Sequence, residues 1–157
     1  MRIGLMALLL GCGGGVGETT ATGTVNGEPL DVGAAFWGGP FVVLAETEFD
    51  CLDMAWVNRY YEEEDPPLDE DLTAVQFTFN DSDVVEGTYN IAGEAALTAR
   101  FLTVRDGIFT IDKGRSGELI IDEITKRDVA NGSFDISFDS GTLKGDLSLP
   151  FCTNLKG

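Results

Sequence analysis

Histidine is absent from the 157 residues of this chain. The usual serine and cysteine nucleophiles need a histidine to activate them, and imidazole is a common ligand of catalytic metals. The sequence also has no G-x-S-x-G, phosphate-loop or dinucleotide-binding motif in a helical context. Ser116 and Ser133 lie beside glycines, but no base is suited to activate them. We therefore expect no catalytic residues, no cofactor and no enzymatic activity.

Basic residues are scarce. Ten lysines and arginines stand against 27 aspartates and glutamates, which gives a formal net charge of −17. A surface this acidic repels phosphate groups, so nucleic acid is excluded as a partner and anionic lipid headgroups are disfavoured. Hydrophobic residues still make up 43% of the chain and include ten phenylalanines, enough for the core of one folded domain.

The chain has no apolar run of about 20 residues, the length that a membrane-spanning helix requires. A shorter run, Ile3–Leu10, follows Arg2 and ends at Gly11-Cys12. This order of basic, apolar and small residues is typical of a secretory signal. The segment Leu9-Leu10-Gly11-Cys12 resembles the lipobox of bacterial lipoproteins, in which the cysteine becomes the first residue of the mature protein and carries two acyl chains of the palmitate type.

This resemblance divides the chain into three parts. It implies a signal peptide at 1–11, a lipidated cysteine with a flexible glycine-rich tether at 12–21, and a folded domain at 22–157. Gly13 occupies the place of the aspartate that marks many Gram-negative lipoproteins for the inner membrane. By that resemblance we expect the protein in the cell envelope, anchored by its lipid to the outer membrane.

Cysteine occurs three times. If Cys12 carries the lipid, Cys51 and Cys152 remain in an oxidising compartment, where an even number of cysteines favours a disulfide. Such a bond would close a loop of about 100 residues. Two free buried thiols are one alternative. A metal site is another, although two thiolates without histidine fall short of the usual four zinc ligands.

The body of the chain consists of short strand-like segments separated by turn residues. Asn26-Gly27 is a strong hairpin signal, and Leu72–Asn80 alternates as a half-buried strand does, with Gln76 and Thr78 on its polar face. Around Met54–Val57 we expect only a short helical turn. The pattern predicts an all-β domain, a single antiparallel sandwich or barrel of about 8–10 strands. The expected strands are Thr20–Val25, Leu30–Trp37, Phe41–Thr47, Leu72–Asn80, Val84–Ile91, Ala96–Arg105, Ile108–Asp112, Gly117–Thr125, Gly132–Phe138 and Thr142–Phe151.

The last two of these segments carry a second resemblance. Gly132-Ser133-Phe134-Asp135-Ile136-Ser137-Phe138 is followed by a strand that ends in Pro150-Phe151-Cys152. The pair resembles the carboxy-terminal hairpin of all-β envelope lipoproteins with the pattern G-S-F-D-x-x-F and then P-F-C. The similarity implies a fold and no activity. Within the second strand, Gly145 falls on the inward face and is expected to mark a bulge or a bend.

The most conspicuous polar feature is the acidic run from Glu62 to Asp71, which Pro66-Pro67 keeps from forming a helix. We expect a solvated loop and no metal site. Calcium favours such oxygen ligands, so Asp65, Asp69 and Asp71 are weak candidates, as is the segment 80–83. Before the run, Arg59-Tyr60-Tyr61 is expected at the rim of the core, with a ligand-facing patch as the alternative.

Two functions are open at this point. The first is a lipid-anchored envelope protein whose β-domain binds or has a structural role, with the membrane and an envelope protein or glycan as partners. The second is a small hydrolase that uses Asp and Glu side chains on carbohydrate. Facing carboxylates in a deep cleft would favour the second, and a filled core with scattered surface acids would favour the first.

Overall fold

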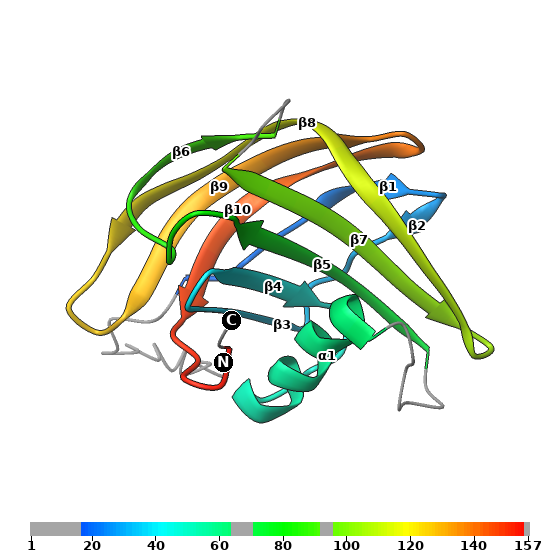
Figure 1. Cartoon of the computed structure of the whole chain (residues 1–157), viewed down its shortest axis with the longest axis horizontal. Coiled ribbons are helices and arrows are strands. Elements are labelled where there is room, and N and C mark those ends of the chain that lie inside the picture. The colour runs from blue at the N-terminus through cyan, green and yellow to red at the C-terminus, as the bar shows by residue number, and fades with distance from the viewer. Residues whose placement is uncertain (1–16, 64–70, 92–95, 156–157) are drawn as a thin grey trace, which may run out of the picture.

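The computed structural model describes residues 17–63, 71–91 and 96–155 (Figure 1). Within them the chain forms ten strands and one helix, so the expected all-β architecture is confirmed. The elements are β1 Thr22–Val25, β2 Glu28–Pro29, β3 Ala34–Gly38, β4 Phe41–Ala45, α1 Cys51–Glu63, β5 Leu72–Phe79, β6 Gly87–Asn90, β7 Leu97–Arg105, β8 Ile108–Ile124, β9 Val129–Phe138 and β10 Gly141–Pro150.

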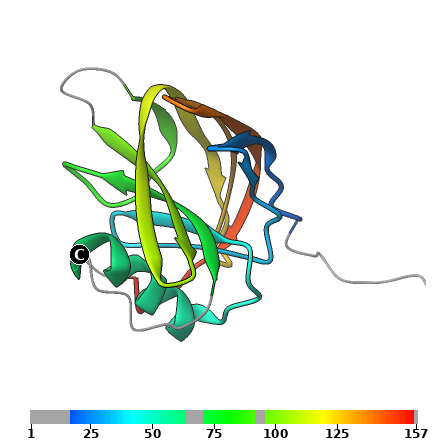
Figure 2. The same ribbon diagram turned by 90° about the vertical axis from the view of Figure 1, so that its right-hand side faces the viewer.

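Nine strands follow one another in a single antiparallel path, β2-β1-β10-β9-β8-β7-β5-β4-β3, and β6 pairs with β8 beside it. The sheet curls into a half-barrel, as Figures 1 and 2 show. Strand β3, at the end of the path, returns to the end of β10. There Trp37 and Phe151 form a parallel bridge, and the Cys152 N–H donates a hydrogen bond of 2.7 Å to the Trp37 carbonyl.

The sheet turns its corner inside β8, which is one strand of 17 residues. Two separate strands, Ile108–Asp112 and Gly117–Thr125, were expected here, and that prediction is wrong. The first part of β8 pairs with β7 and the rest pairs with β9, with a register shift between Gly114 and Ser116. Gly117 has φ 118°, and a Cβ there would lie 2.1 Å from the Asp135 carbonyl oxygen. These glycines bend a continuous strand rather than ending it.

The Asn26-Gly27 hairpin is confirmed between β1 and β2. Both residues have positive φ, 54° and 78°, as a type I′ turn requires. Its second arm is short, because β2 ends at Pro29 and the chain crosses to β3, which begins at Ala34. The single strand expected over Leu30–Trp37 is therefore wrong in its first half.

Helix α1 has 13 residues, so the expectation of only a short helical turn at Met54–Val57 is wrong. Asp50 caps it, since its Oδ1 accepts hydrogen bonds from the N–H groups of Leu52 and Asp53 at 2.8 and 2.9 Å. In return, the Asp53 Oδ2 accepts a longer hydrogen bond of 3.4 Å from the Asp50 N–H, the reciprocal pattern of a capping box. Met54 and Val57 are buried against the sheet.

The half-barrel has apolar residues on both faces of part of its sheet. Its concave side holds the larger cluster, in which Phe77 packs on Phe134 and Phe101 on Phe138 with ring centroids 5.5 and 6.0 Å apart. The smaller cluster lies between α1 and the outer face of the sheet, and Figure 2 shows the helix on that side. Strand β5 is consequently buried on both faces.

The expectation that β5 would be half-buried is therefore wrong. Gln76, on its expected polar face, is only 1% exposed. Its amide Nε2 donates to the Asn58 Oδ1 of α1, which satisfies a polar group that would be costly to bury alone. The alternation in β5 was read as one wet face because α1 had not been recognised as its cover.

The disulfide between Cys51 and Cys152 is confirmed, with a Cα–Cα distance of 5.4 Å. It joins the first residue of α1 to the segment that follows β10, across a sequence separation of 101 residues. The bond therefore fixes the helix and the carboxy-terminal segment to each other beside the point where β3 meets β10.

Replacing Cys51 and Cys152 with alanine should lower the free energy of unfolding by about 2–5 kcal/mol, because the unfolded chain regains the freedom that the loop removed. The measurement is denaturant unfolding of Cys51→Ala/Cys152→Ala against the disulfide-bonded protein, both in a Cys12→Ser background, so that neither form has a free thiol. Leu52→Ala changes an exposed neighbour and should cost less than about 0.5 kcal/mol. Equal losses in the two variants would contradict a stabilising role for the disulfide.

Candidate binding cleft

The junction of β3 with the chain after β10 forms an apolar surface around two aromatic side chains. The indole of Trp37 is fixed by a hydrogen bond of 3.0 Å from its Nε1 to the Asp128 carbonyl oxygen. The Phe151 ring packs on it at 4.8 Å between centroids, tilted by 60°. In Figure 1 this place is found where the β3–β4 turn meets the arrowhead of β10.

A cleft of about 860 Å³ opens beside this aromatic pair. Its volume falls in the range of small-molecule sites, which are concave and mostly apolar with a few polar groups. Only Asp83 and Thr153 bring polar side chains to it. The lining residues are Trp37, Gly39, Pro40, Asp83, Val84, Val85, Phe151, Thr153 and Leu155.

Backbone hydrogen bonds hold the walls of the cleft in place. The Val84 N–H donates to the Gly39 carbonyl at 2.9 Å, which attaches the segment before β6 to the β3–β4 turn. On the other wall, the Leu155 N–H donates to the Cys152 carbonyl, and the disulfide fixes Cys152. Val84 and Leu155 are buried, whereas Val85 is 51% exposed and Phe151 is 40% exposed. The cleft therefore has a rigid apolar floor and an apolar rim open to solvent.

Exposed apolar side chains also occur away from the cleft. Leu52 and Trp56, one helical turn apart, lie on the solvent side of α1, and Ile108 lies at the β7–β8 turn. The Arg59 guanidinium stacks 4.9 Å from the Trp56 ring centroid, so Arg59 belongs to the helix surface and does not face the cleft. The side chains of Tyr60 and Tyr61 lie outside the described residues.

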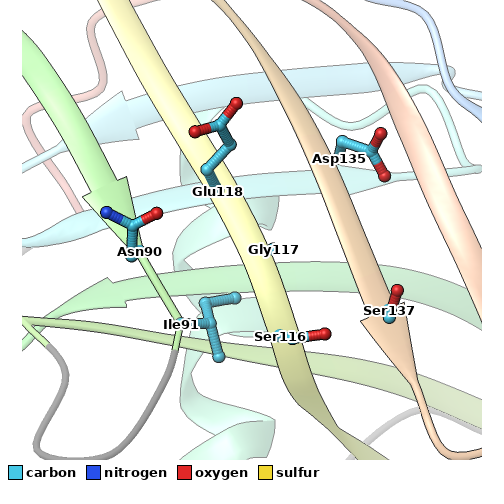
Figure 3. A pocket seen from close by; sticks show the side chains of 7 residues that line it. All are labelled: Asn90, Ile91, Ser116, Gly117, Glu118, Asp135 and Ser137. Atoms are coloured by element: carbon cyan, nitrogen blue, oxygen red, sulfur yellow. The ribbon is translucent and has the colours of Figure 1, made fainter.

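A second, polar groove of about 370 Å³ runs over the outer face of β6, β8 and β9 (Figure 3). Glu118 and Asp135 are register partners on neighbouring strands, and Ser116 and Ser137 form the next pair but one. Figure 3 shows these side chains on the open surface of the sheet, with Asn90 of β6 at one side. Glu118 and Asp135 thus form a carboxylate pair across two neighbouring strands. It is exposed and lacks the enclosed cleft that carboxylates use to cleave a glycosidic bond.

The structure gives no support to a metal site at the predicted candidates within the residues that it describes. Asp65 and Asp69 lie outside the described residues, as does Cys12. Asp71 accepts a hydrogen bond of 3.1 Å from the Asp106 N–H, which ties the start of β5 to the β7–β8 turn. Among the residues that the structure describes, no three Asp, Glu, Cys or His side chains gather as a metal site requires.

Beside the polar groove, Arg115 and Asp139 form an exposed ion pair. Arg115 Nε donates to Asp139 Oδ1 at 2.9 Å, and Nη2 donates to Oδ2. These hydrogen bonds and the positive charge of Arg115 hold the pKa of the Asp139 carboxyl below its ordinary value. Because the folded-state pKa is lowered, the pair stabilises the fold above the unfolded pKa, and this contribution is lost as the pH falls through the folded value.

Arg115→Gln should therefore raise the pKa of the Asp139 carboxyl towards its ordinary value, as read from a carboxyl-detected NMR titration. The free energy of unfolding should change little, since exposed ion pairs contribute little to stability. Arg127→Gln removes the same charge from the β8–β9 turn and should leave the Asp139 titration unchanged. A lowered pKa of Asp139 that persists without Arg115 would show another cause.

Comparison with known proteins finds no matching family model, no matching curated protein and no matching solved structure. Over the described residues, no helix is long and apolar enough to cross a membrane. The cleft itself was not foreseen from the sequence. Trp37 was assigned to a strand leading into a turn and Phe151 to a hairpin motif, and no local pattern links positions so distant in the chain. The disulfide was the one available signal, because it places residue 152 near α1.

Proposed function

We propose that this protein is a lipid-anchored component of the bacterial cell envelope whose β-domain binds an apolar ligand without catalysing a reaction. The observation that carries the binding role is the apolar cleft of about 860 Å³ beside Trp37 and Phe151. A large apolar concavity with few polar groups supports ligand binding. Its rim leaves Val85 and Phe151 exposed at a cost that a bound ligand would relieve.

The anchor rests on the sequence Leu9-Leu10-Gly11-Cys12 and its likeness to a lipobox. Acyl chains on Cys12 would hold the protein at a membrane, since each buried CH₂ contributes about 0.8 kcal/mol. Gly13 after the cysteine favours the outer membrane. The acidic domain, at −17 for the whole chain, would stand away from anionic headgroups.

A hydrolase that uses Asp and Glu on carbohydrate is the alternative. The in-register pair Glu118 and Asp135, with Ser116 and Ser137 nearby, is one arrangement that could carry it. The apolar cleft favours binding over hydrolysis, because its residues supply Asp83 as the single carboxylate and no histidine is available. Binding is therefore the better supported function.

The anchor predicts the behaviour of Cys12→Ser. This variant should move from the membrane fraction to the soluble envelope fraction when both forms are produced with their leader and compared by immunoblot. Cys51→Ser removes a different cysteine and should leave the folded fraction membrane-bound, which controls for a general effect of losing a thiol. If Cys12→Ser stays with the membrane, the anchor is wrong.

Binding at the cleft predicts that an apolar fluorescent probe, N-phenyl-1-naphthylamine, gains emission on the purified protein and loses affinity in Phe151→Ala. The loss should be about tenfold, because the substitution removes much of the apolar area offered to the probe. Trp56→Ala deletes a similarly exposed aromatic ring, 48% exposed, from α1 and serves as the matched control. Equal affinities in the two variants would place the probe elsewhere.

A further inference from the structure

The start of the described chain runs along the free edge of β10, towards the cleft. The Thr20 N–H donates to the Asp146 carbonyl at 2.9 Å. Thr19 and Ser148 are joined twice, from Thr19 Oγ1 to the Ser148 carbonyl and from the Ser148 N–H to Thr19 Oγ1, at 3.0 and 2.9 Å. From Thr20 back to Thr19 the partner on β10 thus changes from Asp146 to Ser148, two residues nearer its end. Thr19, which the sequence assigned to the tether, is hydrogen-bonded to the sheet, as is Thr20, the first residue of an expected strand.

The backbone of this first segment packs closely against β10. A Cβ at Gly145 would lie 1.8 Å from the Thr20 carbonyl oxygen, so Gly145 permits a close approach of the two backbones. At Gly17 a Cβ would still be only 3.3 Å from the Ser148 side chain. The described chain therefore begins beside Ser148, three residues before Phe151 at the cleft. At about 3.3 Å per residue, that distance along β10 is about 10 Å.

The lipid site lies within reach of the cleft. Cys12 precedes Gly17 by five residues, which span at most about 17 Å when fully extended. A lipid on Cys12 is therefore tethered close enough to Phe151 for its acyl chain to enter the cleft. At that short tether length the effective concentration of the chain at the cleft is in the millimolar range.

We propose that the cleft beside Trp37 and Phe151 holds an acyl chain of the lipid on Cys12 whenever the protein is not inserted in a membrane. This proposal deepens the function proposed above and rests on its lipid anchor. The occupant is apolar and uncharged, so the net charge of −17, which repels anionic headgroups, does not oppose its entry.

The two destinations of the acyl chain compete. In water each exposed CH₂ is unfavourable by about 0.8 kcal/mol, so the open apolar rim of the cleft is a better environment than solvent. A bilayer buries the whole chain, whereas the cleft covers part of it. The acyl chain therefore prefers the membrane when one is present. The cleft shields the chain from water during transfer between membranes.

The test uses the mature chain, residues 12–157, with the disulfide formed, so that Cys12 is the single free thiol. It is alkylated with a hexadecyl maleimide that bears a nitroxide on the alkyl chain, or with a short maleimide nitroxide as the control. Trp56→Phe leaves Trp37 as the single tryptophan. The hexadecyl nitroxide should quench Trp37 emission to the same extent at every protein dilution, and the short nitroxide should quench it much less.

A matched pair of variants tests the location. Val85→Asp charges the rim of the cleft and should abolish the quenching. Ile108→Asp adds the same charge at an apolar side chain, 68% exposed, at the β7–β8 turn at the other end of the sheet (Figure 1) and should preserve it. In phosphatidylcholine vesicles the hexadecyl form of Val85→Asp should partition about tenfold more strongly than that of Ile108→Asp, because its cleft no longer competes for the chain.

Several results would overturn the proposal. Quenching that fades on dilution would mean that the chain enters a second molecule. Identical quenching in Val85→Asp and Ile108→Asp, or none from the hexadecyl nitroxide, would exclude the cleft as its place. These outcomes are independent of the anchor, because the alkyl chain is attached chemically. If Cys12→Ser stays in the membrane fraction, the native lipid on Cys12 is disproved. The binding of the chemically attached alkyl chain to the cleft would still stand as measured.

Discussion

The return of β3 to the end of β10 is the contact on which the rest of the fold depends. A curled sheet with two free edges exposes unpaired backbone groups, and closing it removes part of that exposure. Here closure is made by one hydrogen bond, from the Cys152 N–H to the Trp37 carbonyl, and by the packing of Phe151 on the Trp37 ring. The disulfide to Cys51 holds the closing segment in place. The incomplete seam also leaves the concavity between β3 and the carboxy-terminal segment.

A second set of contacts joins β2, at one end of the strand path, to β5 and β7. Arg105, the last residue of β7, donates to Glu28 of β2 at 3.2 Å and to Thr73 of β5 at 2.7 Å, and lies 3.7 Å from Glu46. The ion pairs are partly exposed, so their contribution to stability is small. Their role is geometric, because they bring the short second arm of the first hairpin against the start of β5. The half-barrel is thus fastened at one end by a covalent bond and at the other by a polar cluster.

How far the sequence predicts this structure depends on the range of each signal. Asn26-Gly27 predicted its hairpin because a type I′ turn is fixed by two residues, and the Cys51–Cys152 bond followed from counting cysteines. Two failures arose where a local signal had two meanings. Glycines at 114 and 117 signal a turn or a bend, and only the pairing of β8 with both neighbours decides between them. Gln76 looked solvent-facing because its buried partner lies 18 positions away on α1. The cleft depends on contacts between residues still farther apart in the sequence, such as Trp37 and Phe151, and no local pattern predicts them.

If Cys12 carries acyl chains as proposed, the acidic surface and the apolar cleft answer the same physical problem. A protein that carries acyl chains must stay soluble while exposing them, and a high net charge of one sign keeps the folded domains apart. Charge alone does not protect an acyl chain from water. Salt screens the repulsion between domains beyond about 8 Å at physiological ionic strength, whereas the hydrophobic cost is local to the exposed chain. A local apolar surface meets that cost only if it lies within reach of the lipid. The pairing of Thr19 with Ser148 places the start of the described chain three residues from Phe151, and under the proposal this gives the amino-terminal edge of the sheet a role beyond completing the fold.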